Sequence, residues 1–170
     1  MTDMMPDATR NLRDIAARLP CLEDRPAIAG VGNELRADDA FGVMIARSLA
    51  GRVAVPVFDT GTVPENYLGK VVQAGAKHLI VVDVVDFRGD GGEIRLFGPE
   101  ELEVCHITTH LPAYELAQFF LNVGGVQMLI LAAQPVTLQL AGDMSPAVRK
   151  AADTVTGMLE DLYGKPEEQG

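Results

Sequence analysis

Short apolar runs alternate with amphipathic stretches along most of the chain. Aliphatic runs bounded by Gly, Asn, Asp or Pro favour buried strands, which we expect over residues 27–33, 53–58, 79–85, 93–97 and 127–132. Apolar side chains recur at helical spacing between most of these runs, which predicts helices over 38–50, 64–74, 112–121 and 145–162. Because strand and helix alternate, we predict an α/β fold with a mainly parallel, five-stranded twisted sheet and helices on both faces.

One domain with a short segment at each end is the expected organisation. The chain has 170 residues, which suits a single substantial core. Apolar residues recur at helical spacing from Leu12 to Leu19, so residues 1–25 are expected to be an N-terminal extension with a short helix. Residues 26–163 then form the α/β domain, and residues 164–170 a frayed tail.

The charge balance narrows the range of partners. The net charge is −10, from 14 basic and 24 acidic residues, and such a field repels nucleic acid and anionic membranes. Cys21 and Cys105 are too far apart for a C-x-x-C motif, which argues against a cysteine zinc site or a disulfide framework. No secretory signal is evident and the apolar runs are too short to span a bilayer, so we expect a cytoplasmic protein.

The loop after the first predicted strand carries paired carboxylates. Its sequence, GVGNELRADD over residues 30–39, begins like a dinucleotide-binding loop, but Leu35 stands where the third Gly belongs. Asp38 and Asp39 would occupy the free N–H groups of the following helix and repel a phosphate. The pattern therefore favours a cation here. Asp38 is interpreted as the N-cap of the helix, which leaves Asp39 available.

Two further residues follow other predicted strands. Asp83 interrupts an aliphatic run, where a carboxylate must be paired, hydrogen-bonded or bound to a metal. His110 precedes a predicted helix, and the β-branched residues between it and His106 argue against a helical metal-binding pair. Asp39, Asp83 and His110 thus each lie where α/β folds bind ligands, and this donor set suits Zn, Ni, Fe or Mn. The nucleophile motif G-x-S-x-G is absent from the sequence.

The motifs, taken in order over residues 27–162, resemble those of the nickel-iron hydrogenase maturation endopeptidases. Gly30-Val31-Gly32-Asn33 with Asp38-Asp39-Ala40-Phe41-Gly42 resembles the family signature G-[IV]-G-N-x-L-x-x-D-[DE]-x-x-G. The further matches are Asp59-Thr60-Gly61-Thr62 (D-G-G-T in the family), Leu79 to Asp83, Thr108-Thr109-His110 and Gln134-Pro135. The Val63-Pro64-Glu65-Asn66 and Thr108-Thr109-His110 variants are most similar to the branch that processes the formate-hydrogenlyase hydrogenase.

The resemblance implies both an activity and a site. It implies the hydrogenase maturation protease fold, which is phosphorylase/hydrolase-like, and an endopeptidase that cuts the C-terminal extension from a NiFe-hydrogenase large-subunit precursor after a basic or His residue. Asp39, Asp83 and His110 would be the catalytic, metal-contacting residues, and the nickel would be supplied by the precursor, with no organic cofactor. The metal would polarise the scissile carbonyl or activate a water, with an Asp as base. We expect a monomer.

A second set of candidates supports these three residues. Its acidic members are Asp38, Asp59 and Glu65, and its glycines, which would let the substrate strand approach closely, are Gly30, Gly32 and Gly61.

Two other functions stay open from the sequence. A Rossmann-type nucleotide-dependent enzyme should have a third Gly and an acidic residue about 20 positions after the loop, and Asp59 comes later than that. A chaperone that inspects the metal site of the large subunit without cutting it would also lack a nucleophile. Retention of all three proposed metal-contacting residues favours the endopeptidase over the chaperone.

Overall fold

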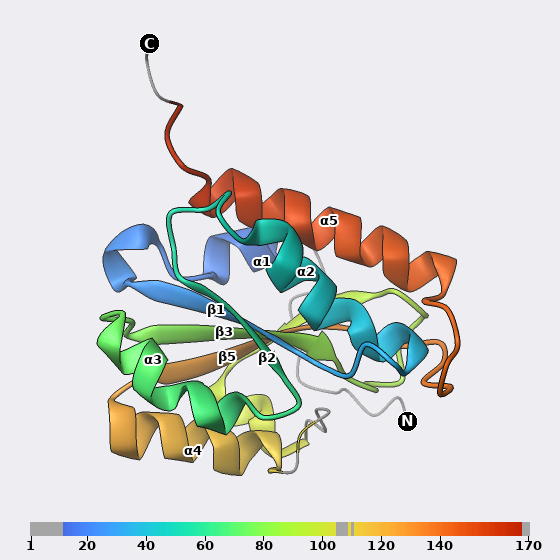
Figure 1. The fold of residues 1–170 in the computed structure, drawn as a ribbon, viewed down its shortest axis with the longest axis horizontal. Helices are drawn as coiled ribbons and strands as arrows, with labels where there is room; N and C mark the ends of the chain where they lie inside the picture. Colours follow the sequence, from blue (N-terminus) through green and yellow to red (C-terminus); the bar gives the residue numbers. More distant parts are fainter. Residues whose placement is uncertain (1–11, 105–108, 110, 168–170) are drawn as a thin grey trace.

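A five-stranded sheet forms the centre of the molecule (Figure 1). The computed structural model describes residues 12–104, 109 and 111–167. The strand order is β2-β1-β3-β5-β4, in which β4 is antiparallel to β5 and the other pairs are parallel. The strands are β1 (Pro26–Val31), β2 (Val57–Gly61), β3 (His78–Val84), β4 (Ile94–Phe97) and β5 (Gln127–Ala133). The predicted α/β fold with a mainly parallel sheet is therefore confirmed.

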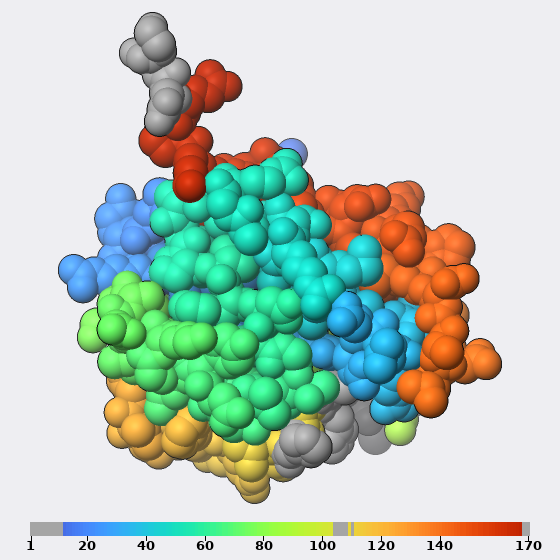
Figure 2. Space-filling view, viewed as in Figure 1, coloured from blue at the N-terminus to red at the C-terminus, as the bar shows by residue number. Residues whose placement is uncertain are grey.

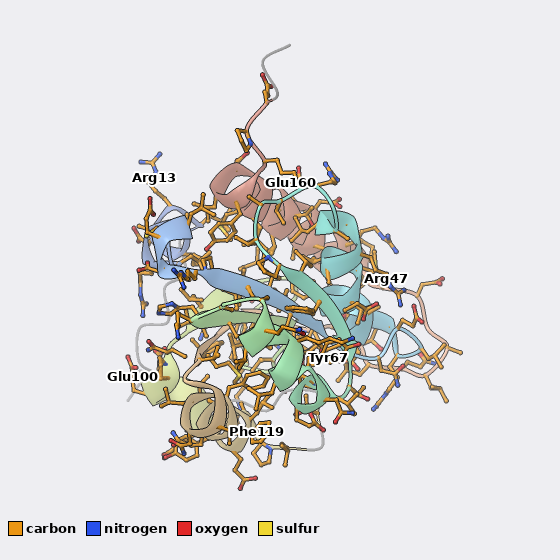
Figure 3. All side chains as sticks on the ribbon, turned by 60° about the vertical axis from the view of Figure 1, so that its left-hand side comes forward. Arg13, Arg47, Tyr67, Glu100, Phe119 and Glu160 are labelled. Carbon is orange, nitrogen blue, oxygen red and sulfur yellow. The ribbon has the colours of Figure 1, made fainter. Side chains whose placement is uncertain are left out.

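Helices cover both faces of this sheet. On one face lie α1 (Leu12–Arg18), α2 (Phe41–Leu49) and α5 (Pro146–Tyr163), and on the other lie α3 (Leu68–Gln73) and α4 (Ala113–Gly124). Figure 3 shows Arg47 and Glu160 with the first group and Phe119 with the second. The core divides in the same way: Ile80 of β3 packs towards α2 and α5, whereas its neighbour Leu79 packs towards α3 and α4. Among the described residues there are also four short 3-10 helices: η1 (Leu22–Asp24), η2 (Ala37–Ala40), η3 (Pro64–Tyr67) and η4 (Pro99–Val104).

The segment after α1 and the end of α5 meet beside the amino ends of the strands. Ile15 of α1 is fully buried and belongs to the same core cluster as α5. The buried hydroxyl of Tyr163 donates to the carbonyl oxygen of Pro20 at 2.6 Å, and Gly164 bridges to Val53. The N-terminal helix is thus packed onto the domain. No helix in the described part of the chain has the length and apolarity that a bilayer crossing needs.

The second strand differs most from its predicted position. A strand was expected over residues 53–58, but β2 covers Val57–Gly61. Pro56 explains the shift, because it has no N–H to give to a ladder and it restricts the residue before it. Val53 and Val55 are buried in the core without joining a strand.

A close helix–sheet contact positions the start of α2. A Cβ atom at Gly30 of β1 would collide with the carbonyl oxygen of Gly42, and one at Gly42 would collide with that of Val82. The glycines therefore let α2 cross β1 and β3 at backbone distance, which is a packing role. Gly30 was expected to give room to the substrate; the structure corrects this, because α2 occupies that space. The contact sets η2, which carries the paired aspartates, against the carboxyl ends of β1 and β3.

Candidate active site

The carboxyl ends of the parallel strands gather most of the buried polar side chains. After β1 the chain turns to α2 on one face, whereas after β3 it passes through β4 to η4 and α4 on the other. A crevice at such a divergence is where open α/β sheets bind ligands. The buried polar side chains at or beyond these strand ends are those of Asp38, Asp39, Thr60, Asp83 and Gln134.

Asp83 is fully buried near the end of β3. Its Oδ1 accepts a hydrogen bond from the N–H of Val84 at 2.8 Å. By strand alternation it follows Leu79 and Val81 on the side of the sheet that α3 and α4 cover. A carboxylate in this position needs polar or cationic partners to remain ionised.

Asp39 lies close to Asp83 across Gly32. It is 1% exposed, and its Oδ2 accepts from the N–H of Asn33 at 3.0 Å. Gly32 has a φ of +147°, and a Cβ there would collide with the carbonyl oxygen of Asp39 and lie 3.7 Å from Oδ1 of Asp83. The structure therefore brings Asp39, Asp83 and Gly32 together, and only glycine fits between them.

His110, the third predicted member, lies outside the described residues, so its place stays a prediction. Leu111, the next residue, packs on the core cluster of the face that Asp83 also faces. Within residues 12–104, 109 and 111–167, no group of three or more His, Cys, Asp or Glu side chains is placed to hold a metal ion. The two described carboxylates are the part of the expected donor set that the structure brings together.

Asp38 does not cap the helix as predicted. It is fully buried in η2, and its carboxylate accepts from the N–H groups of Val136, Thr137 and Ser145 at 2.7, 2.9 and 2.7 Å. The hydroxyl of Ser145 donates to it as well, at 3.0 Å. The N-cap prediction is wrong because the carboxylate of Asp38 accepts from donors about one hundred residues away in the chain and not from the N–H groups of its own helix. Asp38 instead fastens the loop after β5 to the loop after β1.

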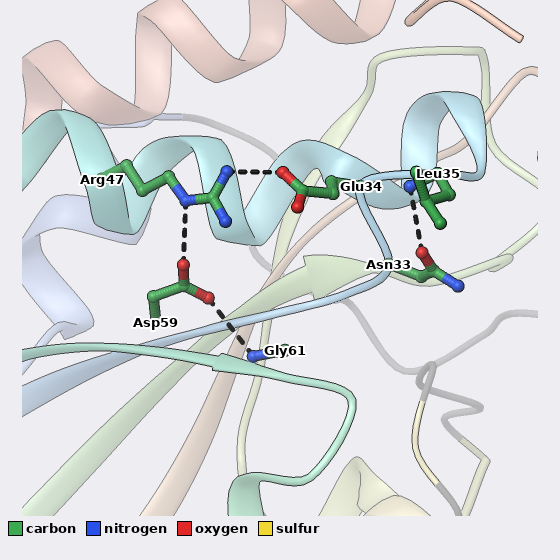
Figure 4. A network of polar contacts seen from close by, with 6 residues as sticks. All are labelled: Asn33, Glu34, Leu35, Arg47, Asp59 and Gly61. Carbon is green, nitrogen blue, oxygen red and sulfur yellow. Dashed lines mark hydrogen bonds and ion pairs between the residues drawn. The ribbon is translucent and has the colours of Figure 1, made fainter. Parts of the chain in front are cut away.

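An open groove of about 290 Å³ lies between the ends of β1 and β2. Arg47 of α2 spans two of its acidic residues (Figure 4): its Nε donates to Oδ2 of Asp59 at 2.9 Å and its Nη1 to Oε2 of Glu34 at 2.5 Å. The hydrogen bond and charge of Arg47 lower the pKa of the Glu34 carboxyl. Asp59 also accepts from the N–H of Gly61, whose φ is +54°. Gly32 and Gly61 both line this groove.

Glu65 stands apart from this groove. It lies in η3, and one of its carboxylate oxygens is buried without a hydrogen bond from any described residue. Its predicted role at the site stays a prediction.

Gln134 and Arg47, near the carboxyl edge of the sheet, were given no role by the sequence analysis of the residues alone. Oε1 of Gln134 accepts from the N–H groups of Phe87 and Gly89, and its Nε2 donates to Asp86 at 2.9 Å. These bonds hold the loop after β3 in place, and the amide of Gln134 lowers the pKa of Asp86. Arg47 gave no sequence signal, because nothing in the spacing links it to residues 34 and 59; Gln134 was marked only by its place in a motif.

The comparisons with known proteins agree on one family. The family model described as hydrogenase maturation protease matches residues 43–162. Hydrogenase 3 maturation protease of Escherichia coli K12 is 30% identical over 142 residues, which cover 79% of this chain and 88% of that protein.

Solved structures give the same result. The [NiFe] hydrogenase maturation protease HycI of Thermococcus kodakarensis KOD1 superposes with a TM-score of 0.73 at 28% identity, covering 82% of this chain and 92% of its own. HybD from Thermococcus kodakarensis, also a [NiFe] hydrogenase maturation protease, reaches a TM-score of 0.69 at 19% identity over 82% of this chain and 99% of its own, which shows a shared fold.

Proposed function

Because this chain belongs to the hydrogenase maturation protease family and is an endopeptidase of hydrogenase maturation, we propose that it processes a NiFe-hydrogenase large-subunit precursor. In this proposal it removes the C-terminal extension of the precursor, and nickel already inserted in the precursor licenses the cut. The observation that carries the proposal is the pair of buried carboxylates, Asp39 and Asp83, gathered around Gly32 at the carboxyl edge.

The chemistry of this pair supports a metal that arrives with the substrate. Two carboxylates with a nearby imidazole would suit nickel, and His110 is the proposed imidazole. The metal of the precursor would polarise the scissile carbonyl or activate the attacking water. A carboxylate would accept the proton of that water and return it to the leaving amine as the C–N bond breaks. The low polarity around Asp83 would strengthen each of these interactions.

The glycines and the groove suggest how the substrate reaches this pair. Gly32 and Gly61 line the groove without side chains, so an extended segment of the precursor could lie against their backbone. The same proposal gives the chain no cofactor of its own and has it act as a monomer in the cytoplasm. The free thiol of Cys21 suits such a reducing compartment.

An in vitro processing assay tests this function. Nickel-loaded and nickel-free precursor are incubated with the wild-type chain and with Asp39→Asn, Asp83→Asn and His110→Ala. We expect the wild type to shorten only the loaded precursor and the three variants to leave it intact. Asp153→Asn, at an exposed position on α5, is the matched control and should cut normally.

Each other outcome has a defined meaning. Cutting of both precursors would contradict the nickel requirement. Binding of the loaded precursor without cutting would make the chain a chaperone. Normal cutting by Asp39→Asn or Asp83→Asn would remove those carboxylates from the mechanism.

A further inference from the structure

Four apolar side chains are exposed on the two loops beside the active site. Leu35 is 65% exposed in the loop after β1, and Val136, Leu138 and Leu140 are 60%, 40% and 69% exposed in the loop after β5. We call these four residues the rim patch. Residues 136–140 alternate apolar and polar as a strand would, but they join no strand, and the apolar side chains are exposed to solvent. A concentration of exposed apolar side chains marks an interaction surface.

The two loops form one rigid surface because several bonds connect them. Asp38 accepts its four hydrogen bonds from residues of the loop after β5. The N–H of Ala141 donates to the carbonyl oxygen of Leu35 at 2.8 Å, and Nε of Arg36 donates to that of Leu138 at 3.3 Å. Figure 2 shows the orange loop after β5 beside the blue loop after β1 at the right edge of the molecule. The rim patch is therefore presented in a fixed shape.

The rim patch continues into the groove between the ends of β1 and β2, which shares Gly32 with the pair of buried carboxylates. Leu35 belongs to the patch and also lines the groove together with Gly32 and Asp59. A protein whose extended segment lies in the groove must therefore place its adjoining surface over the patch. None of the four patch residues is charged, although the chain has a net charge of −10. The patch itself is apolar and the exposed Glu34 and Arg36 lie on either side of Leu35, so it suits an apolar surface with a polar rim.

We propose that the rim patch binds an apolar surface of the folded large-subunit precursor, next to the extension that is cut. This inference rests on the proposed function, because it takes the precursor as the partner. The patch contributes binding affinity and the carboxylates take part in the reaction, so the two roles affect different kinetic constants. Loss of the patch raises the KM and the dissociation constant of the precursor and leaves kcat unchanged.

The double variant Leu138→Ser/Leu140→Ser tests this separation. Its matched control is Leu121→Ser/Val123→Ser, which removes two exposed apolar side chains at the carboxyl end of α4, away from the groove. We expect the patch variant to raise the KM and the dissociation constant for nickel-loaded precursor about tenfold, with kcat within about twofold of wild type. The control should change neither, and unchanged thermal midpoints would show that both variants fold.

The measurements distinguish this inference from the proposed function. An unchanged dissociation constant in the patch variant would overturn the docking surface, even if the wild type cuts the precursor normally. A wild type that binds the precursor without cutting it would overturn the proposed function, while the binding comparison still tests the patch. If the wild-type chain sediments as a dimer that Leu140→Ser separates, the patch binds a second copy and the proposal is wrong.

Discussion

The two edges of the sheet contain similar side chains in different surroundings. At the amino edge, the exposed thiol of Cys21 donates to a carboxylate oxygen of Asp24 at 3.0 Å, and Nδ1 of His78 contacts the backbone oxygen of Asp24 at 2.9 Å. At the carboxyl edge, Asp39 and Asp83 are almost completely buried. Cysteine, aspartate and histidine near one another therefore do not identify a site here. Burial of a carboxylate shows that it must have polar partners, because removing its charge from water is costly, and those partners separate the structural Asp38 from the proposed catalytic pair.

Two carboxylates, one at each edge, also differ in the sequence separation of their hydrogen-bond partners. Asp24 is hydrogen-bonded to Cys21, three residues away, in a short local turn. Asp38 is hydrogen-bonded to Val136, Thr137 and Ser145 across the whole domain. A local contact can form in a short segment, whereas a long-range one exists only when the domain is folded. The hydrogen bonds of the Asp38 carboxylate thus depend on the fold in a way that those of the Asp24 carboxylate do not.

Replacing Asp83 with Asn, at the carboxyl edge, should have the largest effect of the changes considered at either edge. We expect processing of loaded precursor to fall by about a thousandfold, because the site loses the negative charge proposed to take part in the reaction. Asn has nearly the same size and keeps an acceptor for the N–H of Val84, so the activity should fall far more than the free energy of unfolding. Steady-state kinetics and urea denaturation measure both quantities. A large loss of stability together with activity would show that Asp83 acts mainly as a structural residue.

Replacing Asp38 with Ala should reduce stability more than the equivalent change at the amino edge. Three backbone N–H groups and one hydroxyl lose their acceptor, so we expect the free energy of unfolding to fall by about 3 kcal/mol. Asp24→Ala, which disrupts only a local cap at an exposed position, should cost much less. Denaturant titration of the two variants compares them directly. Equal losses would contradict the contrast between long-range and local contacts.

The smallest expected effect concerns the reactivity of Cys21. The hydrogen bond to Asp24 raises the pKa of the Cys21 thiol, which keeps more of it protonated. Asp24→Asn removes the negative charge and should lower that pKa, so alkylation at pH 8 should become a few-fold faster. Cys21→Ser gives the background from Cys105. An unchanged alkylation rate in Asp24→Asn would show that the carboxylate does not control the pKa of this thiol. Asp24→Asn should process the precursor normally.

The sequence predicts the strands of the sheet closely except for the edge strand β2; the other edge strand, β4, agrees with its predicted range. Residues 79–85 and 127–132 were expected to be strands, and β3 (His78–Val84) and β5 (Gln127–Ala133) agree closely, because aliphatic strands buried on both faces leave a clear pattern. The edge strand β2 was misplaced because Pro56 stops the pairing of an apolar run that is buried for another reason.

The site was partly predictable for a similar reason. Asp39 and Asp83 come together because parallel strands end at one edge, and that rule can be applied to a sequence. The role of Asp38 depends on donors about one hundred residues away, and that of Arg47 on two acidic residues in different loops. Neither arrangement has a local pattern. His110 lies outside the described residues and stays a prediction.

The path of α5 has a practical consequence for attaching the enzyme to a support. This helix starts beside the carboxyl edge at Pro146 and ends at Tyr163, where Pro20 and Val53 hold the chain near the amino ends of the strands. Residues 164–167 lead away from the domain at the upper left in Figure 1, far from the carboxyl edge of the sheet. A chain tethered to a bead or a sensor surface beyond residue 167 would therefore hold the proposed active site towards the solution, where the proposed precursor can reach it.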